Sequence, residues 1–284
     1  MIEILKAVLM GVVEGITEWL PISSTGHMIL LEDLVKFELS DEFLSMFRVV
    51  IQLGAILAVV VLYFDRLWPF RRPEHPAVAR GGVWQRLQPW MKLEVWRLWG
   101  LILIASLPAA VIGLPLDDWM DEHLYNSAVV GAMLILYGVF FLVIENGRVP
   151  RITRMEQLTW KHAVIVGVWQ VLALIPGTSR SGATIVGGLL LGLSRPVAAQ
   201  FTFYLAIPVM AGASGLKLVK YLLEGGTFMA LEVGVLFTGM AVAFVVSMLC
   251  IGFLMQYVKK HTFKPFGWYR IALGLVVLAA EFLK

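Results

Sequence analysis

The chain has 284 residues, of which 59% are hydrophobic and 15% are charged, and its mean hydropathy is +0.82. Soluble domains are about 45–50% apolar and about 25% charged, so a soluble fold of this length could not bury so much apolar surface. The apolar composition also excludes disordered, fibrous and nucleic-acid-binding proteins. The net charge of +3 does not indicate a nucleic-acid partner, because the basic residues lie in loops between apolar runs. We therefore predict an all-α polytopic membrane protein, with residues 1–284 forming a single integral membrane domain.

The first apolar segment, Ile2–Leu34, is interrupted by two glutamates and by the polar run Pro21–His27. A helix that crosses a bilayer needs about 20 consecutive apolar residues. Because the glutamates and the polar run interrupt it, this segment is apolar but broken.

Six later runs meet or approach the length of a membrane span. They are Phe43–Phe64, Leu98–Leu116, Ser127–Ile144, Ala198–Leu223, Ala230–Met255 and Phe266–Leu283. Between the third and the fourth of these runs, the apolar segment His162–Leu193 is broken by Pro176 and by the run Gly177–Gly182. The sequence thus predicts about six transmembrane helices and two broken segments.

Basic residues predict the orientation of the spans, because short cytoplasmic loops accumulate Lys and Arg. The predicted cytoplasmic loop 65–97 carries seven of them, and loops 145–161 and 259–264 are also basic, whereas loop 117–122 is acidic. With the basic loops inside, the first broken segment must enter and leave on the outside, and the second on the inside. Both are therefore predicted to be re-entrant helical hairpins, which are tolerated where protein or a watery cavity surrounds them. Both chain termini are expected outside.

The two broken segments resemble each other. A shift of 156 residues aligns Gly11–Leu30 with Gly167–Val186 without a gap. The identities include Ser23 with Ser179 and Gly26 with Gly182. Each half then holds one hairpin and three spans, and an odd number of spans inverts the second half. We therefore predict an inverted-topology repeat, with repeat one at about 1–145 and repeat two at about 157–284, which places discontinuous helices around a midplane site.

Glu14 and Glu18 are four residues apart and are expected on one face of a helix. Ionised side chains at bilayer depth cost about 2.5–3.5 kcal/mol on insertion scales, so they are functional candidates by default. The pair suits a divalent metal or proton transfer. The alternative is that Glu18 lies near a helix end in contact with water.

The run Pro21–His27 supplies hydroxyl groups and an imidazole. Ser, Thr and Gly before an apolar run are also typical of an ordinary helix N-cap, and an isolated His is usually a packed core residue. The glutamates just upstream and the matching break in the other half favour a functional role for Ser24 and His27.

The second break, Pro176–Thr184, places Arg180 among glycines and small hydroxyl residues. Glycines let the backbone approach an oxyanion, helix N-terminal N–H groups donate to it, and a guanidinium binds phosphate oxygens in pairs. Together with the carboxylates and the hydroxyl of the first break, this anion site predicts phosphoryl transfer, which needs positioning, charge neutralisation and an activated nucleophile.

The chain contains Glu-x-x-x-Glu, then Pro-x-Ser-Ser-x-Gly-His, and, in the second half, Pro-Gly-x-Ser-Arg-Ser-x-x-Thr. With these motifs it resembles the undecaprenyl-pyrophosphate phosphatase family, also called the bacitracin-resistance proteins. The resemblance extends over essentially the whole chain, including the stretch Lys260–Phe266. It implies a bacterial inner-membrane hydrolase that converts undecaprenyl pyrophosphate to undecaprenyl phosphate and orthophosphate with Mg²⁺ or Ca²⁺. Such an enzyme recycles the lipid carrier for peptidoglycan synthesis, confers bacitracin resistance and opens its active site to the periplasm.

The resemblance also implies roles for individual residues. Glu14 and Glu18 would bind the metal or assist proton transfer, and Arg180 would hold the pyrophosphate. Ser24 and His27 would be the nucleophile and its partner; we favour Ser24 activated by His27, and His27 as the phosphorylated residue is the rival. The residues expected to line the substrate pocket are Ser23, Thr25, Gly26, Gly177, Thr178, Ser179, Arg180, Ser181 and Thr184.

Two other functions remain open from the sequence. A transporter or flippase of a polyprenyl phosphate lipid would share the inverted repeat, with the glutamates coupling protons, but it would not need a nucleophile. An inorganic anion channel would require a polar path through both faces, and the polar runs are too local for that. The expected partners are the polyprenyl pyrophosphate substrate and membrane lipids, with no nucleic acid, and a homodimer is left open.

Overall fold

A computed structural model describes residues 1–70, 90–146 and 149–282 of the chain. All regular elements in these residues are helices, so the predicted all-α class is confirmed. Parts of the basic loops, among them Arg71, Arg72, Arg80, Arg86 and Arg148, lie outside the described residues, as does Leu283.

Six helical segments of the described residues are long and apolar enough to cross a membrane. They are α3 with α4 (Asp41–Val50 and Gln52–Leu62), α7 (Leu93–Leu124), α8 (Ser127–Ile144), α11 (Arg195–Leu223), α12 (Ala230–Tyr257) and α13 (Lys264–Phe282). Each coincides with one predicted span, so the prediction of a multi-pass membrane protein with six spans is confirmed. Two short elements, α5 (Phe64–Leu67) and the 3₁₀ turn η2 (Met155–Gln157), lie in the connections.

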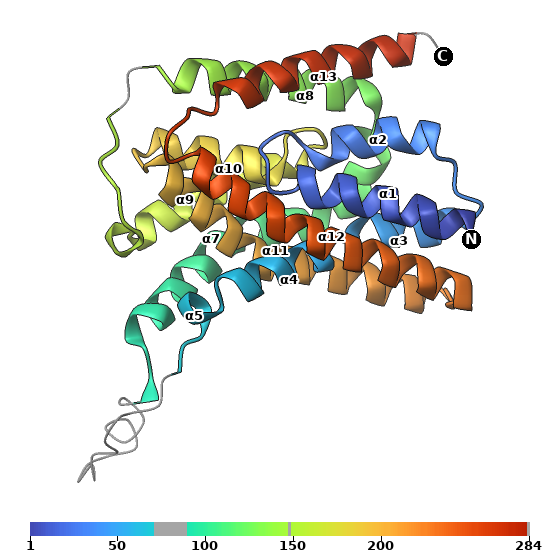
Figure 1. Ribbon diagram of the computed structural model, residues 1–284, viewed down its shortest axis with the longest axis horizontal. Helices are drawn as coiled ribbons and strands as arrows, with labels where there is room; N and C mark the ends of the chain where they lie inside the picture. Colours follow the sequence, from blue (N-terminus) through green and yellow to red (C-terminus); the bar gives the residue numbers. More distant parts are fainter. Residues whose placement is uncertain (71–89, 147–148, 283–284) are drawn as a thin grey trace.

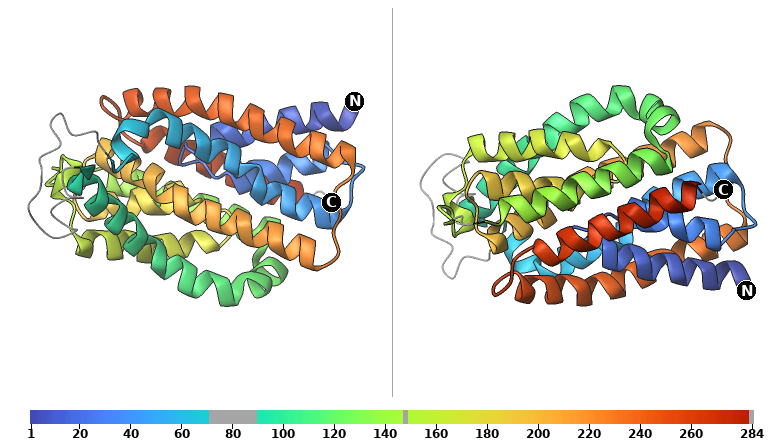
Figure 2. Two further views of the ribbon diagram at one scale, coloured as in Figure 1. Left: turned by 90° about the horizontal axis from the view of Figure 1, so that it is seen from below. Right: turned by 90° about the horizontal axis from the view of Figure 1, so that it is seen from above.

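The predicted acidic loop at 117–122 is wrong. Helix α7 continues beyond its apolar stretch to Leu124 and contains Pro108 and Pro115. Once a helix is nucleated, each further residue adds one backbone hydrogen bond, so polar residues can prolong it into water. The helix accommodates its prolines by bending, and α7 is visibly curved (Figure 2).

Both broken segments fold as pairs of short helices. The first pair is α1 (Ile2–Thr17) with α2 (Ser24–Leu34). The second is α9 (Trp160–Val171), extended by the 3₁₀ turn η3 (Leu172–Leu174), with α10 (Arg180–Leu190). The open ends of the two hairpins lie at opposite ends of the bundle, and their turns lie inside it (Figure 1).

The long helices hold these hairpins in place. Helix α1 packs along α12, and α9 packs along α7, while α8 and α13 form a further close pair. Each hairpin is thus supported by one span of the other half. The inversion of one half relative to the other stays a prediction.

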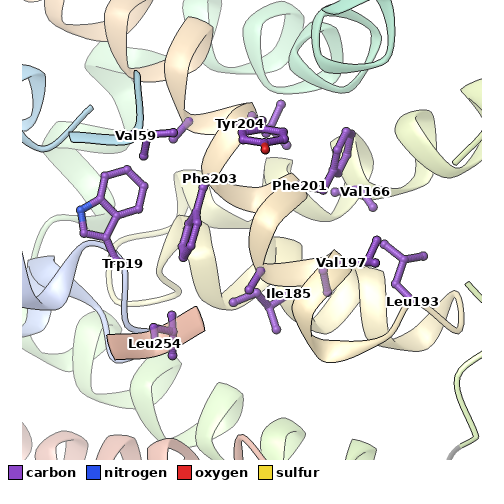
Figure 3. Packing of buried hydrophobic residues seen from close by; sticks show 14 of the residues in the cluster. Trp19, Val59, Val166, Ile185, Leu193, Val197, Phe201, Phe203, Tyr204 and Leu254 are labelled. Carbon is purple, nitrogen blue, oxygen red and sulfur yellow. The ribbon is translucent and has the colours of Figure 1, made fainter. Parts of the chain in front are cut away.

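The central core anchors the turn of the first hairpin. Trp19 is fully buried and meets Phe203 of α11 edge to face, with ring centroids 5.2 Å apart. Leu254 of α12 belongs to the same buried cluster (Figure 3). Burying a side chain of this size contributes about 1.5–3 kcal/mol, and since Trp19 follows Glu18 directly, the core also fixes the position of that carboxylate.

One close helix approach is open to a direct test. A Cβ atom at Gly54 of α4 would lie 2.0 Å from the carbonyl oxygen of Met240 in α12. Gly54→Ala therefore forces the two backbones apart, and we expect it to lower the free energy of unfolding by about 1–3 kcal/mol. Thermal unfolding in detergent measures the loss.

Gly212→Ala is the matched control, because a Cβ atom at Gly212 meets nothing within 4 Å. Equal melting temperatures for the two variants would contradict the close packing of α4 against α12.

Candidate active site where two helix turns meet

Both hairpin turns end in a serine with unusual backbone geometry. Ser23 has a φ of 73° and Ser179 a φ of 70°, and they are the only non-glycine residues with positive φ in the described ranges. Each hydroxyl caps the helix that follows, accepting a hydrogen bond from the N–H of Gly26 at 3.4 Å or Gly182 at 3.2 Å. Such backbone conformations cost about 1–3 kcal/mol each and persist only where the surroundings enforce them.

The serine caps place two helix N-termini next to each other. Helices α2 and α10 begin at Ser24 and Arg180, directly after the caps. A helix N-terminus carries partial positive charge and free N–H donors, so it attracts anions. Two of them at the meeting point of the turns form a favourable environment for a phosphate group.

An ion pair joins the two turns. Arg180 Nη2 and Nε lie 3.1 Å and 3.3 Å from Glu18 Oε1, and the two side chains are only 10% and 8% exposed. Arg180 Nη1 also donates to the carbonyl oxygen of Thr202 in α11 at 2.9 Å. The guanidinium group lies over the Trp19 ring at 5.8 Å, a distance at which cation–π attraction operates. Arg180 is therefore held in one place by several partners.

The same carboxylate receives the hydroxyl of Ser24. Ser24 Oγ donates to Glu18 Oε2 at 2.9 Å, while the other oxygen, Oε1, accepts from Arg180. Glu18 thus links the predicted nucleophile to the predicted phosphate-binding arginine. A hydroxyl within hydrogen-bond reach of a carboxylate, which is itself oriented by a third group, is the usual arrangement for an activated nucleophile.

His27 lies in the same turn, but both of its ring nitrogens are engaged elsewhere. Nδ1 lies 2.7 Å from the carbonyl oxygen of Ser23, and Nε2 lies 2.7 Å from the hydroxyl of Tyr269 in α13. Because a carbonyl only accepts hydrogen bonds, Nδ1 carries the hydrogen, and in the neutral ring Nε2 accepts from Tyr269. The geometry therefore couples Ser24 to Glu18 and couples His27 to Tyr269.

Arg270 of α13 holds both turns through hydrogen bonds, and the sequence analysis did not predict this role. This side chain is fully buried, and Nη2 donates to the carbonyl oxygens of Gly177 and Thr178 at 2.8 and 2.9 Å. Nη1 donates to Pro21 in the other turn at 3.2 Å, and the group lies over the Tyr137 ring at 5.5 Å. The available signal was an arginine inside an apolar span, which indicates a functional residue by default.

Glu14 is the carboxylate best placed to accept a metal ion. It is 1% exposed, and its Oε1 has no hydrogen-bond partner among the described residues. A buried carboxylate oxygen without a partner fits a hard cation such as Mg²⁺ or Ca²⁺. The residues that the structure describes contain no cluster of three or more His, Cys, Asp or Glu, so the phosphate oxygens of a substrate would have to complete the coordination.

The equivalent position in the second hairpin is Gln170, 156 residues after Glu14. It is also buried, and neither amide atom has a partner within the described ranges. The two hairpins therefore match in backbone geometry but differ in charge at this position.

The other predicted pocket residues fall into two groups. Thr25, with Glu14 and Ser24, lines a cavity of about 280 Å³. The remaining ones mostly hold the turns together. Ser181 donates to the carbonyl oxygen of Leu20 at 3.4 Å, and Thr184 Oγ1 lies 2.8 Å from Thr202 Oγ1. Gly177 has a φ of +90°, and a Cβ atom there would lie 2.5 Å from the carbonyl oxygen of Val130, so this position requires glycine.

Comparisons with known proteins agree with this chemistry. The family model described as bacitracin resistance protein BacA matches residues 7–276. Proteins named undecaprenyl-diphosphatase are similar to the chain over nearly its full length. The one from Acetivibrio thermocellus is 54% identical over 281 residues, which is 98% of this chain and 97% of the relative. Those from Enterococcus faecalis and Lactiplantibacillus plantarum are each 52% identical, covering 96% and 98% of this chain and 95% and 98% of the relatives.

The hydrogen bonds of Arg270 generate a stability prediction. Arg270→Met removes the donors to three buried carbonyl oxygens, and hydrogen bonds from charged groups contribute about 1.5–3 kcal/mol each. We expect the free energy of unfolding in detergent to fall by about 3 kcal/mol or more.

The exposed Arg154 provides the matched control, since Arg154→Met should change stability by less than about 0.5 kcal/mol. If both variants unfolded at the same temperature as the native chain, Arg270 would not hold the turns.

Proposed function

The chain belongs to the bacitracin resistance protein BacA family, and on this premise we propose that it hydrolyses undecaprenyl pyrophosphate to undecaprenyl phosphate and orthophosphate. It is a membrane-embedded phosphatase, and its reaction returns the lipid carrier to peptidoglycan synthesis and supports resistance to bacitracin. The observation that carries the assignment is the hydrogen-bonded series Ser24–Glu18–Arg180 at two helix N-termini. It combines a nucleophile, a proton acceptor and a phosphate-binding cation in one place.

The proposed reaction has two steps. Ser24 Oγ attacks the terminal phosphorus, Glu18 accepts the hydroxyl proton, and the bond from that phosphorus to the bridging oxygen breaks to release undecaprenyl phosphate. Water then attacks the phosphoserine, orthophosphate leaves, and Ser24 recovers its proton. Arg180 and the N-termini of α2 and α10 stabilise the charge that develops on the phosphoryl oxygens.

A divalent cation, Mg²⁺ or Ca²⁺, fits the same site. Glu14 and Glu18 would hold it, since one oxygen of Glu14 lacks a partner in the described residues. When bound, it would neutralise charge on the pyrophosphate. Glu18 would then serve both the cation and Ser24.

His27 has a supporting part in this proposal. Its hydrogen bonds to Ser23 and Tyr269 fix the ring and brace the strained cap that precedes Ser24. His27 as the phosphorylated residue remains the rival assignment, because it lies in the same turn as the serine. Ser23, Ser179 and Gly26 contribute by shaping the two helix N-termini that receive the substrate.

The location that we propose is the bacterial plasma membrane, with the active site and both termini on the outer, periplasmic side. The charge pattern supports this orientation, because the connections with basic residues lie at one end of the bundle and both termini at the other (Figure 1). An inverted repeat of the two halves is part of the same proposal, supported by the matched serine caps.

A lipid transporter or flippase is the alternative function. The hydrogen bond between Ser24 and Glu18 favours hydrolysis, because transport has no use for an activated hydroxyl.

The first prediction concerns the activity. Purified protein in detergent should release orthophosphate from a C15 or C55 prenyl pyrophosphate when Mg²⁺ or Ca²⁺ is present. Ser24→Ala, Glu18→Gln and Arg180→Ala should each lower kcat by about 10²-fold or more. Ser106→Ala in α7 is the control, since among the described residues Ser106 donates only to the carbonyl oxygen of Ile102 in its own helix. A folded native protein that releases no phosphate would overturn the phosphatase and turn attention to lipid flipping in liposomes.

The second prediction identifies the nucleophile. Rapid acid quenching after mixing with substrate labelled at the terminal phosphate should trap phosphoserine, which survives acid and is cleaved by alkali. Label that is instead lost in acid and kept in alkali would show phosphohistidine and assign the attack to His27.

A further inference from the structure

The cavity beside the first turn is also lined by positively charged side chains. Its lining includes Glu14 and Ser24, which the proposed function already uses, and Thr25. Arg48 of α3, Lys217 of α11 and Tyr125 line the same cavity. Neither Arg48 nor Lys217 belongs to the polar runs that marked the site in the sequence.

Arg48 is held in a defined position. Its Nε donates to Glu32 Oε1 at 2.6 Å, and its guanidinium carbon lies 5.9 Å from the centre of the Tyr125 ring. The side chain is 33% exposed and Glu32 23%, so both reach water at the rim. A guanidinium held through Nε keeps its Nη groups for a second acceptor.

The charges around the cavity indicate what Arg48 and Lys217 are for. Glu14 is the acidic residue of the lining. Arg180 does not line this cavity and is paired with Glu18, and Arg270 donates to buried carbonyl oxygens. A pyrophosphate carries several negative charges, and Arg48 and Lys217 add positive charge to the cavity that Ser24 lines.

Resting on the proposed function, we propose that this cavity is the compartment for the terminal phosphate, and that Arg48 and Lys217 bind it. They hold the terminal phosphoryl group of the substrate against Ser24 and then hold the orthophosphate product until it leaves. Their contribution is to binding, since Ser24 and Glu18 carry out the bond changes. The ligand class is an inorganic phosphate or the terminal phosphate of a diphosphate ester.

The test compares Arg48→Gln, Lys217→Gln and the double variant with the native chain. We expect each single change to raise KM for a C15 prenyl pyrophosphate about tenfold, as for the loss of one charge-assisted hydrogen bond. The concentration of added orthophosphate that halves the activity should rise by a similar factor. Arg48→Lys and Lys217→Arg should restore part of both values because they keep the charge.

Two control variants separate binding from structure. Lys220 lies one turn beyond Lys217 and does not line this cavity, although it lines a neighbouring one, so Lys220→Gln should leave KM unchanged. Glu32→Gln removes the ion pair of Arg48 but keeps the guanidinium group. If Glu32→Gln raised KM as much as Arg48→Gln, the arginine would only be a structural partner and the proposal would fail.

The outcomes also distinguish this inference from the proposed function. No phosphate release by the native chain would overturn both. Release by the native chain with unchanged KM and unchanged phosphate inhibition in the double variant would overturn the terminal-phosphate compartment alone. Binding of labelled orthophosphate gives a readout that does not depend on turnover. It is measured on Ser24→Ala protein with and without the Arg48 and Lys217 changes. If the proteins with and without these changes bound orthophosphate equally well, that result would also count against the compartment.

Discussion

Backbone that leaves the helical pattern inside an apolar bundle must find its hydrogen-bond partners within the protein, and Arg270 meets this need for both turns at once. Its guanidinium group joins Pro21 in one turn to Gly177 and Thr178 in the other. A hydrophobic residue at this position would leave those carbonyl oxygens without donors. The strained serine caps, the two helix N-termini and the position of Ser24 all follow from turns that this contact keeps together.

The charged side chains at the site have different partners and different tasks. Arg270 stabilises backbone, and Arg180 is paired with Glu18, which in turn accepts the hydroxyl of Ser24. Glu14 keeps an oxygen without a partner among the described residues. In a medium of low dielectric constant each unpaired charge is costly, so pairing keeps the resting site close to neutral. In the proposed reaction, a cation and a pyrophosphate would enter it together.

The sequence predicted the six spans, the two broken segments and the residues at their turns, because hydropathy, proline and glycine act locally. It missed Arg270 and Tyr269, whose partners Pro21 and His27 are more than 240 residues away, since pairing at that separation depends on tertiary packing. For the same reason it joined Ser24 to His27, its neighbour in the run, whereas the structure joins Ser24 to Glu18. It also ended α7 too early, because an acidic stretch can continue a helix as well as interrupt it.

Both turns have a serine cap with positive φ, yet equivalent positions carry different side chains. Ser24 corresponds to Arg180, and Glu14 corresponds to Gln170, each pair being 156 residues apart. If both turns were chemically alike, a pyrophosphate could lie across them in either of two directions, and half of the bound molecules would present the wrong phosphorus. Placing the nucleophile on one turn and the guanidinium on the other removes that degeneracy. In the proposed reaction, this difference between the two turns would give the substrate one polarity, and with it a single direction for its prenyl chain.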